Sequence, residues 1–226
     1  MTIVIAAGGT GGHLYPAIAL AREFLRRNAM TRILFVGTTR GLEAKVLAHE
    51  GFELVLISAK PVMGRRPMEV FLGLCAMPVT LWQCRKILRA RRPDLVIGVG
   101  GYTSPMMIVA AAMTGISRVI VEPNAHPGLA NKAVGSLVQR VFLAFGSAAP
   151  AFAADKVRVV GTPIRREFLT KALSPSMTKP EGRRHLLIFG GSQGAKAVNS
   201  AAIEALPALL RHDPTLTVTH ETGEAY

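Results

Sequence analysis

The stretch Ile3-Val4-Ile5-Ala6-Ala7-Gly8-Gly9-Thr10-Gly11-Gly12-His13 carries a short apolar run into a glycine-rich turn, and a helix-like pattern follows. The same order recurs near the other end, where Leu186 to Phe189 leads into Gly190-Gly191-Ser192-Gln193-Gly194-Ala195. Glycines let the backbone come close to a ligand, and the N–H groups and dipole of a helix N-terminus favour an anion. The sequence therefore predicts two anion sites, on two half-molecules that could close on one phosphorylated ligand.

Apolar, β-branched runs alternate with helical patterns along the whole chain. Such alternation favours parallel sheets with crossover helices, so we expect an α/β fold that binds its ligands at the carboxyl ends of the strands. A polar stretch at 161–184 indicates a junction, which gives domains over 1–163 and 164–226. We expect strands at 2–7, 32–37, 53–58, 95–99, 118–122, 140–144, 157–160, 185–189 and 215–219, and helices at 14–27, 41–50, 67–91, 104–114, 127–136 and 195–210.

The charge is strongly positive and unevenly spread. The formal net charge is +13, and residues 1–149 carry 17 Lys and Arg against 7 Asp and Glu. Such a balance suits nucleic acid, a phosphorylated substrate or an anionic membrane surface. Nucleic acid is disfavoured because the chain has no helix-turn-helix signature, no zinc-ligand spacing and no aromatic strand of the RNA-binding type.

Nothing in the sequence indicates secretion or a membrane span. The first 21 residues lack Lys and Arg, so no signal peptide is expected. The uncharged stretch from Leu95 to Ser117 contains Gly98-Val99-Gly100-Gly101-Tyr102 and Pro105, which favour strand, turn and helix over a transmembrane helix. Cys75 and Cys84 would face opposite ways on one helix, so we expect no disulfide and a reduced, cytosolic protein.

Neither glycine loop has the pattern of a common nucleotide site. A P-loop needs Lys and Ser or Thr directly after its last glycine, but Gly12 precedes His13-Leu14 and Gly194 precedes Ala195-Lys196. The second strand ends in Val36-Gly37-Thr38-Thr39-Arg40, without the acidic residue that binds the ribose of NAD. NADP bound through Arg40 remains open.

Six motifs occur in order along the chain: Gly8-Gly9-Thr10-Gly11-Gly12-His13, Gly98-Val99-Gly100-Gly101-Tyr102, Glu122-Pro123-Asn124, Gly128-Leu129-Ala130-Asn131-Lys132, Gly161-Thr162-Pro163-Ile164-Arg165 and Gly190-Gly191-Ser192-Gln193-Gly194-Ala195. Together they resemble the MurG family of peptidoglycan glycosyltransferases, within glycosyltransferase family 28, from about residue 2 to residue 223. The resemblance implies a GT-B fold, with two Rossmann-like domains, of which the first binds the lipid-linked acceptor and the second most of UDP-GlcNAc.

The implied reaction is an inverting transfer of GlcNAc from UDP-GlcNAc to the C4 hydroxyl of undecaprenyl-pyrophosphoryl-MurNAc-pentapeptide, which converts lipid I to lipid II. The resemblance implies no cofactor and no bound metal, and the chain has only three Asp and no Asp-x-Asp pair. It also implies a peripheral enzyme on the cytoplasmic face of the bacterial inner membrane.

Two residues are expected to be catalytic. His13 stands at a helix N-terminus, where the dipole lowers its pKa and favours a neutral base, although it could equally cap the helix. Glu122 ends a strand and could equally cap the following turn. A solvated Arg165, a structural Asn131 and an ordinary tight turn at 100–102 also remain open. The residues expected to bind substrate are Thr10, Gly11, Gly12, Asn124, Arg165, Ser192, Gln193 and Gly194 for the donor, and Gly100, Gly101, Tyr102 and Asn131 for the acceptor diphosphate.

A basic, apolar segment at 60–92 holds eight Lys and Arg and one acid. Apolar residues framed by basic ones suit a face that touches anionic lipid, although a core helix with a solvated basic side is the alternative. The expected membrane face comprises Phe71, Leu74, Leu81, Trp82 and Arg85.

The chain departs from the family pattern in several places. Val121 and Pro123 stand where His and Gln are common, and Glu221 stands where Gln is common. Later family motifs of the donor domain do not follow, so we expect the chain by itself to bind UDP-GlcNAc poorly and to turn over little. The alternatives are a non-catalytic module that binds the acceptor or the membrane and needs a separate donor half, and an NADP-dependent oxidoreductase.

Overall fold

The structure is a computed structural model that describes residues 1–9, 11–38, 43–59, 67–172, 184–191 and 194–223. Side chains are described for the same residues except 67–75 and 170–172. The chain divides into two compact units, Met1–Thr170 and Lys171–Tyr226, and each is described by itself.

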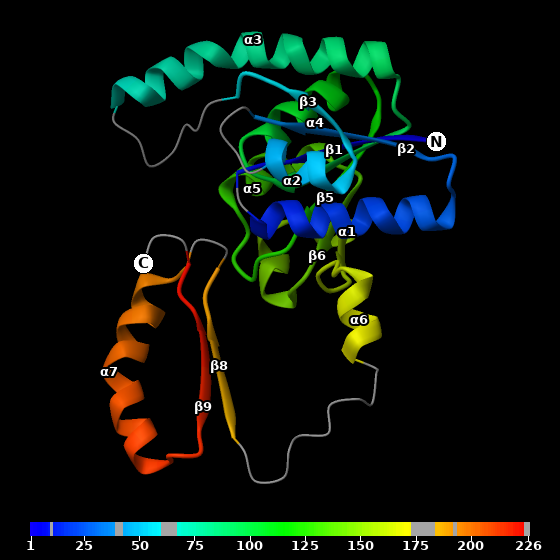
Figure 1. Ribbon diagram of the computed structural model, residues 1–226. Helices are drawn as coiled ribbons and strands as arrows, with labels where there is room; N and C mark the ends of the chain where they lie inside the picture. Colours follow the sequence, from blue (N-terminus) through cyan, green and yellow to red (C-terminus); the bar gives the residue numbers. More distant parts are fainter. Residues whose placement is uncertain (10, 39–42, 60–66, 173–183, 192–193, 224–226) are drawn as a thin grey trace. The chain divides into compact units, whose positions relative to one another are not determined.

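The first unit is built on one parallel sheet with the strand order β3-β2-β1-β4-β5-β6-β7 (Figure 1). The strands are β1 (Thr2–Ala7), β2 (Arg32–Gly37), β3 (Glu53–Leu56), β4 (Leu95–Gly100), β5 (Ser117–Glu122), β6 (Arg140–Leu143) and β7 (Val157–Val159). The helices are α1 (Gly11–Arg27), α2 (Glu43–Glu50), α3 (Pro67–Arg91), α4 (Thr103–Met113), α5 (Leu129–Val134) and α6 (Arg166–Ala172), with short 3-10 turns η1 (Gly135–Leu137), η2 (Gly146–Ala151) and η3 (Ala154–Lys156).

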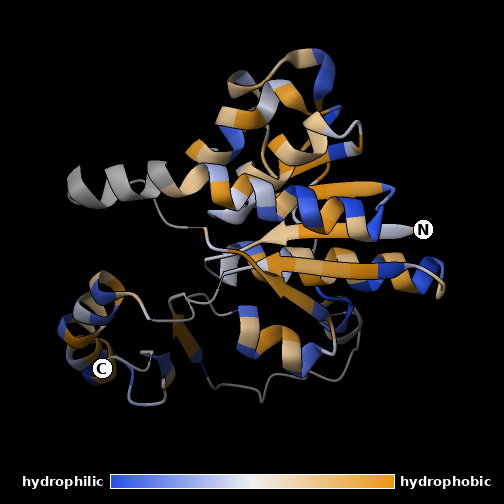
Figure 2. Cartoon of the chain, turned by 90° about the horizontal axis from the view of Figure 1, so that it is seen from above, coloured by the Kyte–Doolittle hydropathy of each residue, from blue (hydrophilic) through white to orange (hydrophobic). Residues whose placement is uncertain are grey.

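The sheet is buried on both faces, as parallel sheets require. Ile3 and Ile5 of β1 pack with α1 and α2 on one face, while Val4 and Ala6 pack with α3 and α4 on the other. Figure 2 shows the resulting runs of hydrophobic residues along the central strands. The unbroken apolar character of these strands therefore follows from burial on two sides. The predicted α/β fold has a buried core on each face of its sheet.

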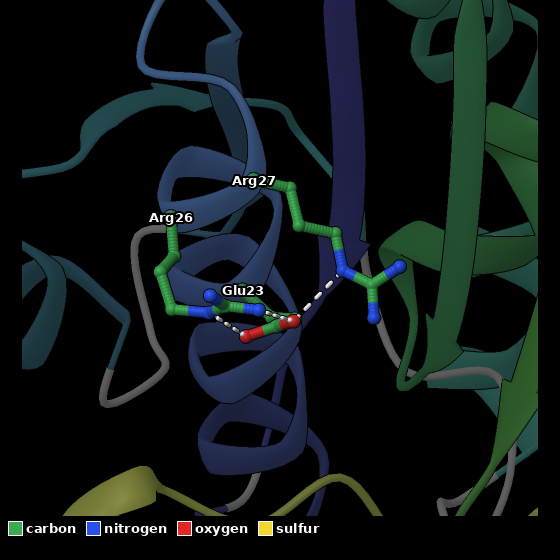
Figure 3. A network of polar contacts seen from close by, with 3 residues as sticks. All are labelled: Glu23, Arg26 and Arg27. Carbon is green, nitrogen blue, oxygen red and sulfur yellow. Dashed lines mark hydrogen bonds and ion pairs between the residues drawn. The ribbon is translucent and has the colours of Figure 1, made fainter.

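Helix α1 begins at Gly11, three residues before the predicted start, so His13 lies in its first turn. At its other end Glu23 accepts hydrogen bonds from the guanidinium groups of Arg26, at 2.8 and 2.7 Å, and of Arg27, at 2.8 Å (Figure 3). The hydrogen bonds from Arg26 and then Arg27 lower the pKa of Glu23 to about 2. These cations also suit the negative end of the helix dipole.

The stretch 95–117 forms β4, a turn, α4 and the start of β5, as the interpretation of strand, turn and helix predicted. Among the helices that the structure describes, none is long and apolar enough to cross a bilayer. The sequence missed α6 and the 3-10 turns, which are too short to show a periodic pattern.

The second unit consists of β8 (His185–Phe189), α7 (Lys196–His212) and β9 (Thr217–Glu221), with the two strands paired in parallel. Strand β9 begins two residues later than predicted. The reason is a turn in which the N–H and hydroxyl of Thr215 bond to Oδ1 of Asp213, at 3.0 and 2.6 Å.

Candidate active site at the carboxyl ends of the strands

The candidate site lies where the strand order of the first unit changes direction, between β1 and β4. The loops Gly8-Gly9 and Gly100-Gly101 leave these strands side by side. Gly101 has a φ of +78°, and a Cβ there would lie 2.1 Å from the carbonyl oxygen of Gly8. Only glycine permits this contact, so the sequence pattern brings two separate motifs into one site.

The imidazole of His13 packs directly on Gly100. A Cβ on Gly100 would lie 2.6 Å from Cδ2 and 2.7 Å from Nε2 of the ring. Burial lowers the pKa of His13, and the negative charge of Glu122 partly opposes this effect. The predicted direction is confirmed, but the main cause is desolvation rather than the helix dipole. The burial thus favours the neutral form of the imidazole.

Glu122 is fully buried and both of its oxygens are engaged. Oε1 accepts hydrogen bonds from the N–H and the Nδ2 of Asn124, at 3.0 and 2.8 Å. Oε2 accepts from the N–H of Gly128 at 2.9 Å and from Nδ2 of Asn131 at 3.0 Å. A carboxylate has about four acceptor positions. Glu122 therefore holds the loop after β5 in shape, which corresponds to the turn-capping alternative, and it acts on His13 through its charge.

The N-terminus of α4 follows directly after the loop Gly100-Gly101. Tyr102, its N-cap residue, makes no side-chain capping hydrogen bond and is 46% exposed. The hydroxyls of Thr103 and Ser104 are buried and have no hydrogen-bond partner among the described residues. The first N–H groups of a helix need hydrogen-bond acceptors, which a capping side chain, water or a bound ligand can provide. The geometry therefore suits the predicted phosphate position at 100–102.

A buried carboxylate packs against the first glycine loop and accepts a hydrogen bond from it. Glu43 is 1% exposed, and its Oε1 accepts a hydrogen bond from the N–H of Gly9 at 3.0 Å. A Cβ on Gly8 would lie 2.5 Å from this oxygen, and one on Gly37 would lie 3.2 Å from Cβ and Cγ of Glu43. Sequence reasoning missed Glu43, although the glycines that border it were visible.

Arg165 follows β7 and belongs to the first unit with His13. Its guanidinium carbon lies 4.9 Å from the ring centroids of both Tyr15 and Phe168. The sequence singled out neither aromatic residue, because the contact joins α1 to α6 and leaves no local pattern. The cation is thus fixed by stacking on rings.

In the second unit the glycine loop after β8 is tied to the end of β9. Gly194 has a φ of +79°, and a Cβ there would lie 2.1 Å from the carbonyl oxygen of Thr222. Nδ2 of Asn199 donates to that oxygen at 2.8 Å, and Oδ1 of Asn199 lies 3.1 Å from Nε2 of His220. Because Oδ1 of Asn199 can only accept a hydrogen bond, Nε2 of His220 is the donor and carries the proton in this contact.

Some of the predicted site residues lie outside the described part of the chain. Thr10, Ser192 and Gln193 are among them, and so are the side chains of Phe71 and Leu74. The structure thus gathers His13, Gly100, Gly101, Glu122 and the two asparagines in the first unit, which also contains Arg165. Gly194 belongs to the second unit.

Of the described residues of the expected membrane face, Trp82 is exposed, whereas Leu81 and Arg85 are half-buried and Leu81 packs against the core. Trp82 is 62% exposed, with the ammonium of Lys86 5.5 Å from a ring centroid. Cys84 and Leu88 of the same helix are buried in the core. A hollow of about 710 Å³ is lined by Pro78, Leu81, Trp82, Arg85, Lys86, Arg89 and Ala90.

Two solved structures share this arrangement of strands and helices. MurG of Acinetobacter baumannii gives a TM-score of 0.73 at 23% identity, with 99% of this chain and 59% of that chain covered. A putative UDP-N-acetylglucosamine 2-epimerase of Listeria monocytogenes gives 0.65 at 12% identity, with 98% and 62% covered. The fold is of the GT-B class, with a Rossmann-like first domain and the first part of a second.

The chain belongs to glycosyltransferase family 28, since residues 3–143 match the N-terminal domain of that family. The UDP-N-acetylglucosamine–N-acetylmuramyl-(pentapeptide) pyrophosphoryl-undecaprenol N-acetylglucosamine transferase of Syntrophus aciditrophicus is 47% identical over 222 residues, which cover 98% of this chain and 61% of that protein. The protein of the same name from Geotalea daltonii is 41% identical, with 99% and 61% covered. The chain thus spans 61% of the length of each of these relatives.

Proposed function

We propose that this chain carries the acceptor side of an inverting hexosyltransferase that moves GlcNAc from UDP-GlcNAc to the C4 hydroxyl of lipid-linked MurNAc-pentapeptide. The observation that carries the proposal is the packing of the His13 imidazole on Gly100, where two glycine loops touch at the change of strand order. Membership of family 28 and the names of the relatives support it. In this role the chain serves peptidoglycan synthesis.

His13 acts as the base of the proposed reaction. Its imidazole takes the proton from the acceptor hydroxyl while the oxygen attacks the anomeric carbon of GlcNAc. The bond from that carbon to the diphosphate oxygen breaks, and UDP leaves with the electron pair. Arg165 stabilises the charge that develops on the diphosphate. Glu122 holds the loop that presents Asn124, and its charge keeps the pKa of His13 from falling further.

The two substrates take different loops. The donor sugar borders Thr10, Gly11, Gly12 and Asn124, and the donor phosphates meet the loop of Ser192, Gln193 and Gly194. The acceptor diphosphate takes the N-terminus of α4 at 100–102, near the loop that Asn131 supports. The uncapped helix end and the contact between Gly8 and Gly101 favour this division. Residues 1–163 are then the acceptor domain and 164–226 the start of the donor domain, whereas the compact units of the structure divide after Thr170, so that Arg165 lies in the first unit.

Helix α3 provides a peripheral contact with the anionic cytoplasmic face of the inner membrane. The exposed ring of Trp82 and the cations of Arg85, Lys86 and Arg89 border one apolar hollow. Aromatic rings and cations together suit the interface of an anionic bilayer. A lipid-linked acceptor would reach the site from such a surface.

The test is an assay of UDP release with a lipid I analogue, on this chain and on this chain joined to the remaining C-terminal part of the Syntrophus relative. We expect release by the joined chain, lowered about 10²- to 10⁴-fold by His13→Ala. Unchanged turnover in that variant would exclude His13 as the base. Binding of the lipid I analogue without any release would indicate an acceptor-binding module instead.

A further inference from the structure

The guanidinium of Arg165 lies over two aromatic rings of the first unit. The guanidinium carbon lies 4.9 Å from the ring centroid of Tyr15 on α1 and 4.9 Å from that of Phe168 on α6. Both distances are within the range of a cation–π contact. Two helices far apart in the sequence thus fix one cation.

The hydrogen-bonding edge of Arg165 remains available. The side chain is half-buried, and the ion pairs formed by the described residues involve other groups. A guanidinium is planar and donates from its edge, whereas rings contact its faces. Stacking therefore restricts the orientation of the group without using its donors, which suits bidentate binding of a phosphate.

We infer that Tyr15 and Phe168 are positioning residues that orient Arg165 toward a diphosphate. The inference rests on the proposed function, in which Arg165 meets the leaving diphosphate. Tyr15 stands two residues after His13 on α1. The same helix therefore sets the position of the base and of the cation, and the two rings act as a clamp on Arg165.

The first test titrates the chain with inorganic pyrophosphate in a calorimeter. Arg165→Ala abolishes the binding. Tyr15→Ala and Phe168→Ala each weaken it about two- to thirtyfold, as the loss of one cation–π contact predicts. Tyr15→Phe keeps the ring and stays within about twofold of the wild type. Phe145→Ala, at another exposed ring, changes nothing.

The second test needs no ligand and reads the Nε–H resonance of Arg165 by NMR. We expect ring currents to shift it from the position of a free arginine, and Tyr15→Ala to move it back. A variant Tyr15→Ala with the resonance and the pyrophosphate affinity of the wild type overturns the inference. So does an Arg165→Ala chain that binds pyrophosphate normally. Absence of sugar transfer by the joined chain counts against the proposed function but leaves the clamp standing.

Discussion

At the scale of single residues, His13 depends on two opposing effects. Burial lowers its pKa below 6.5, and the charge of Glu122 raises it. Because the neutral form is favoured, the base remains available as the pH falls below the usual range of imidazole. Protonation of His13 at lower pH then costs folded-state stability, since the unfolded chain binds that proton more readily.

We therefore expect Glu122→Gln to lower the pKa of His13 further. The variant removes the negative charge, and it also leaves two of the four donors around Oε1 and Oε2 without an acceptor, at a cost of about 2–5 kcal/mol of stability. An NMR titration of the imidazole Cε1–H resonance measures the first effect, and urea unfolding measures the second. A higher pKa of His13 in the variant would contradict the sign of the proposed interaction.

Two glycines with similar backbone conformations should respond very differently to substitution. Gly51 has a φ of +74° with nothing within 4 Å of a Cβ, whereas a Cβ on Gly101 would meet the carbonyl oxygen of Gly8. We expect Gly51→Ala to cost about 1–2 kcal/mol from the left-handed conformation alone. Gly101→Ala adds a backbone collision and should cost clearly more. If both variants lost the same unfolding free energy, the loops of Gly8 and Gly101 would be able to move apart at no cost, which would contradict this prediction.

At the scale of elements, helix α3 has one face buried in the core and one face exposed to solvent. Cys84 and Leu88 are buried in the core, while Trp82, Lys86 and Arg89 are exposed. We expect Trp82→Ala to reduce flotation with anionic liposomes, and Arg89→Gln to weaken it about fivefold, as one surface cation is worth about 1 kcal/mol. Met113→Ala, at an exposed apolar residue of α4, is the matched control. Equal flotation with neutral liposomes would remove the electrostatic part of the argument.

The elements also show what a sequence can predict. Strands such as 2–7 and 32–37 were predicted to the residue, because burial on both faces leaves an unbroken apolar run. The start of α1 was placed too late, since glycines at 11 and 12 have low helix propensity and hide the first turn from a pattern-based prediction. The stacking of Arg165 on Tyr15 and the bond from Gly9 to Glu43 join distant segments, so no local pattern could reveal them.

At the scale of the whole molecule, the two units differ in how much they bury. Both clusters of core residues belong to the first unit, whereas among the described residues of the second unit only Asn199 and Ala202 are buried. Leu187 and Phe189 of β8 are 56% and 67% exposed. The second unit should therefore be the less stable of the two.

A chain that ends at Ala172 should keep the main thermal transition of the first unit. Its melting temperature should change by no more than about 2 °C, since the core of the first unit loses no residue. Differential scanning calorimetry of the two chains measures this. A large fall in melting temperature would mean that the second unit contributes contacts to the stability of the first.

The carboxylate of Glu43, which packs against the first glycine loop, limits which residues homologues can have at the neighbouring glycines. Glu43 fills the space that a side chain at Gly8 or Gly37 would need. A lineage that keeps the glutamate can accept a larger residue at either glycine only if Glu43 moves, while one that loses the glutamate leaves space at both positions. The three positions are therefore inherited as a set, and a change at one of them in a homologue should be matched by changes at the others.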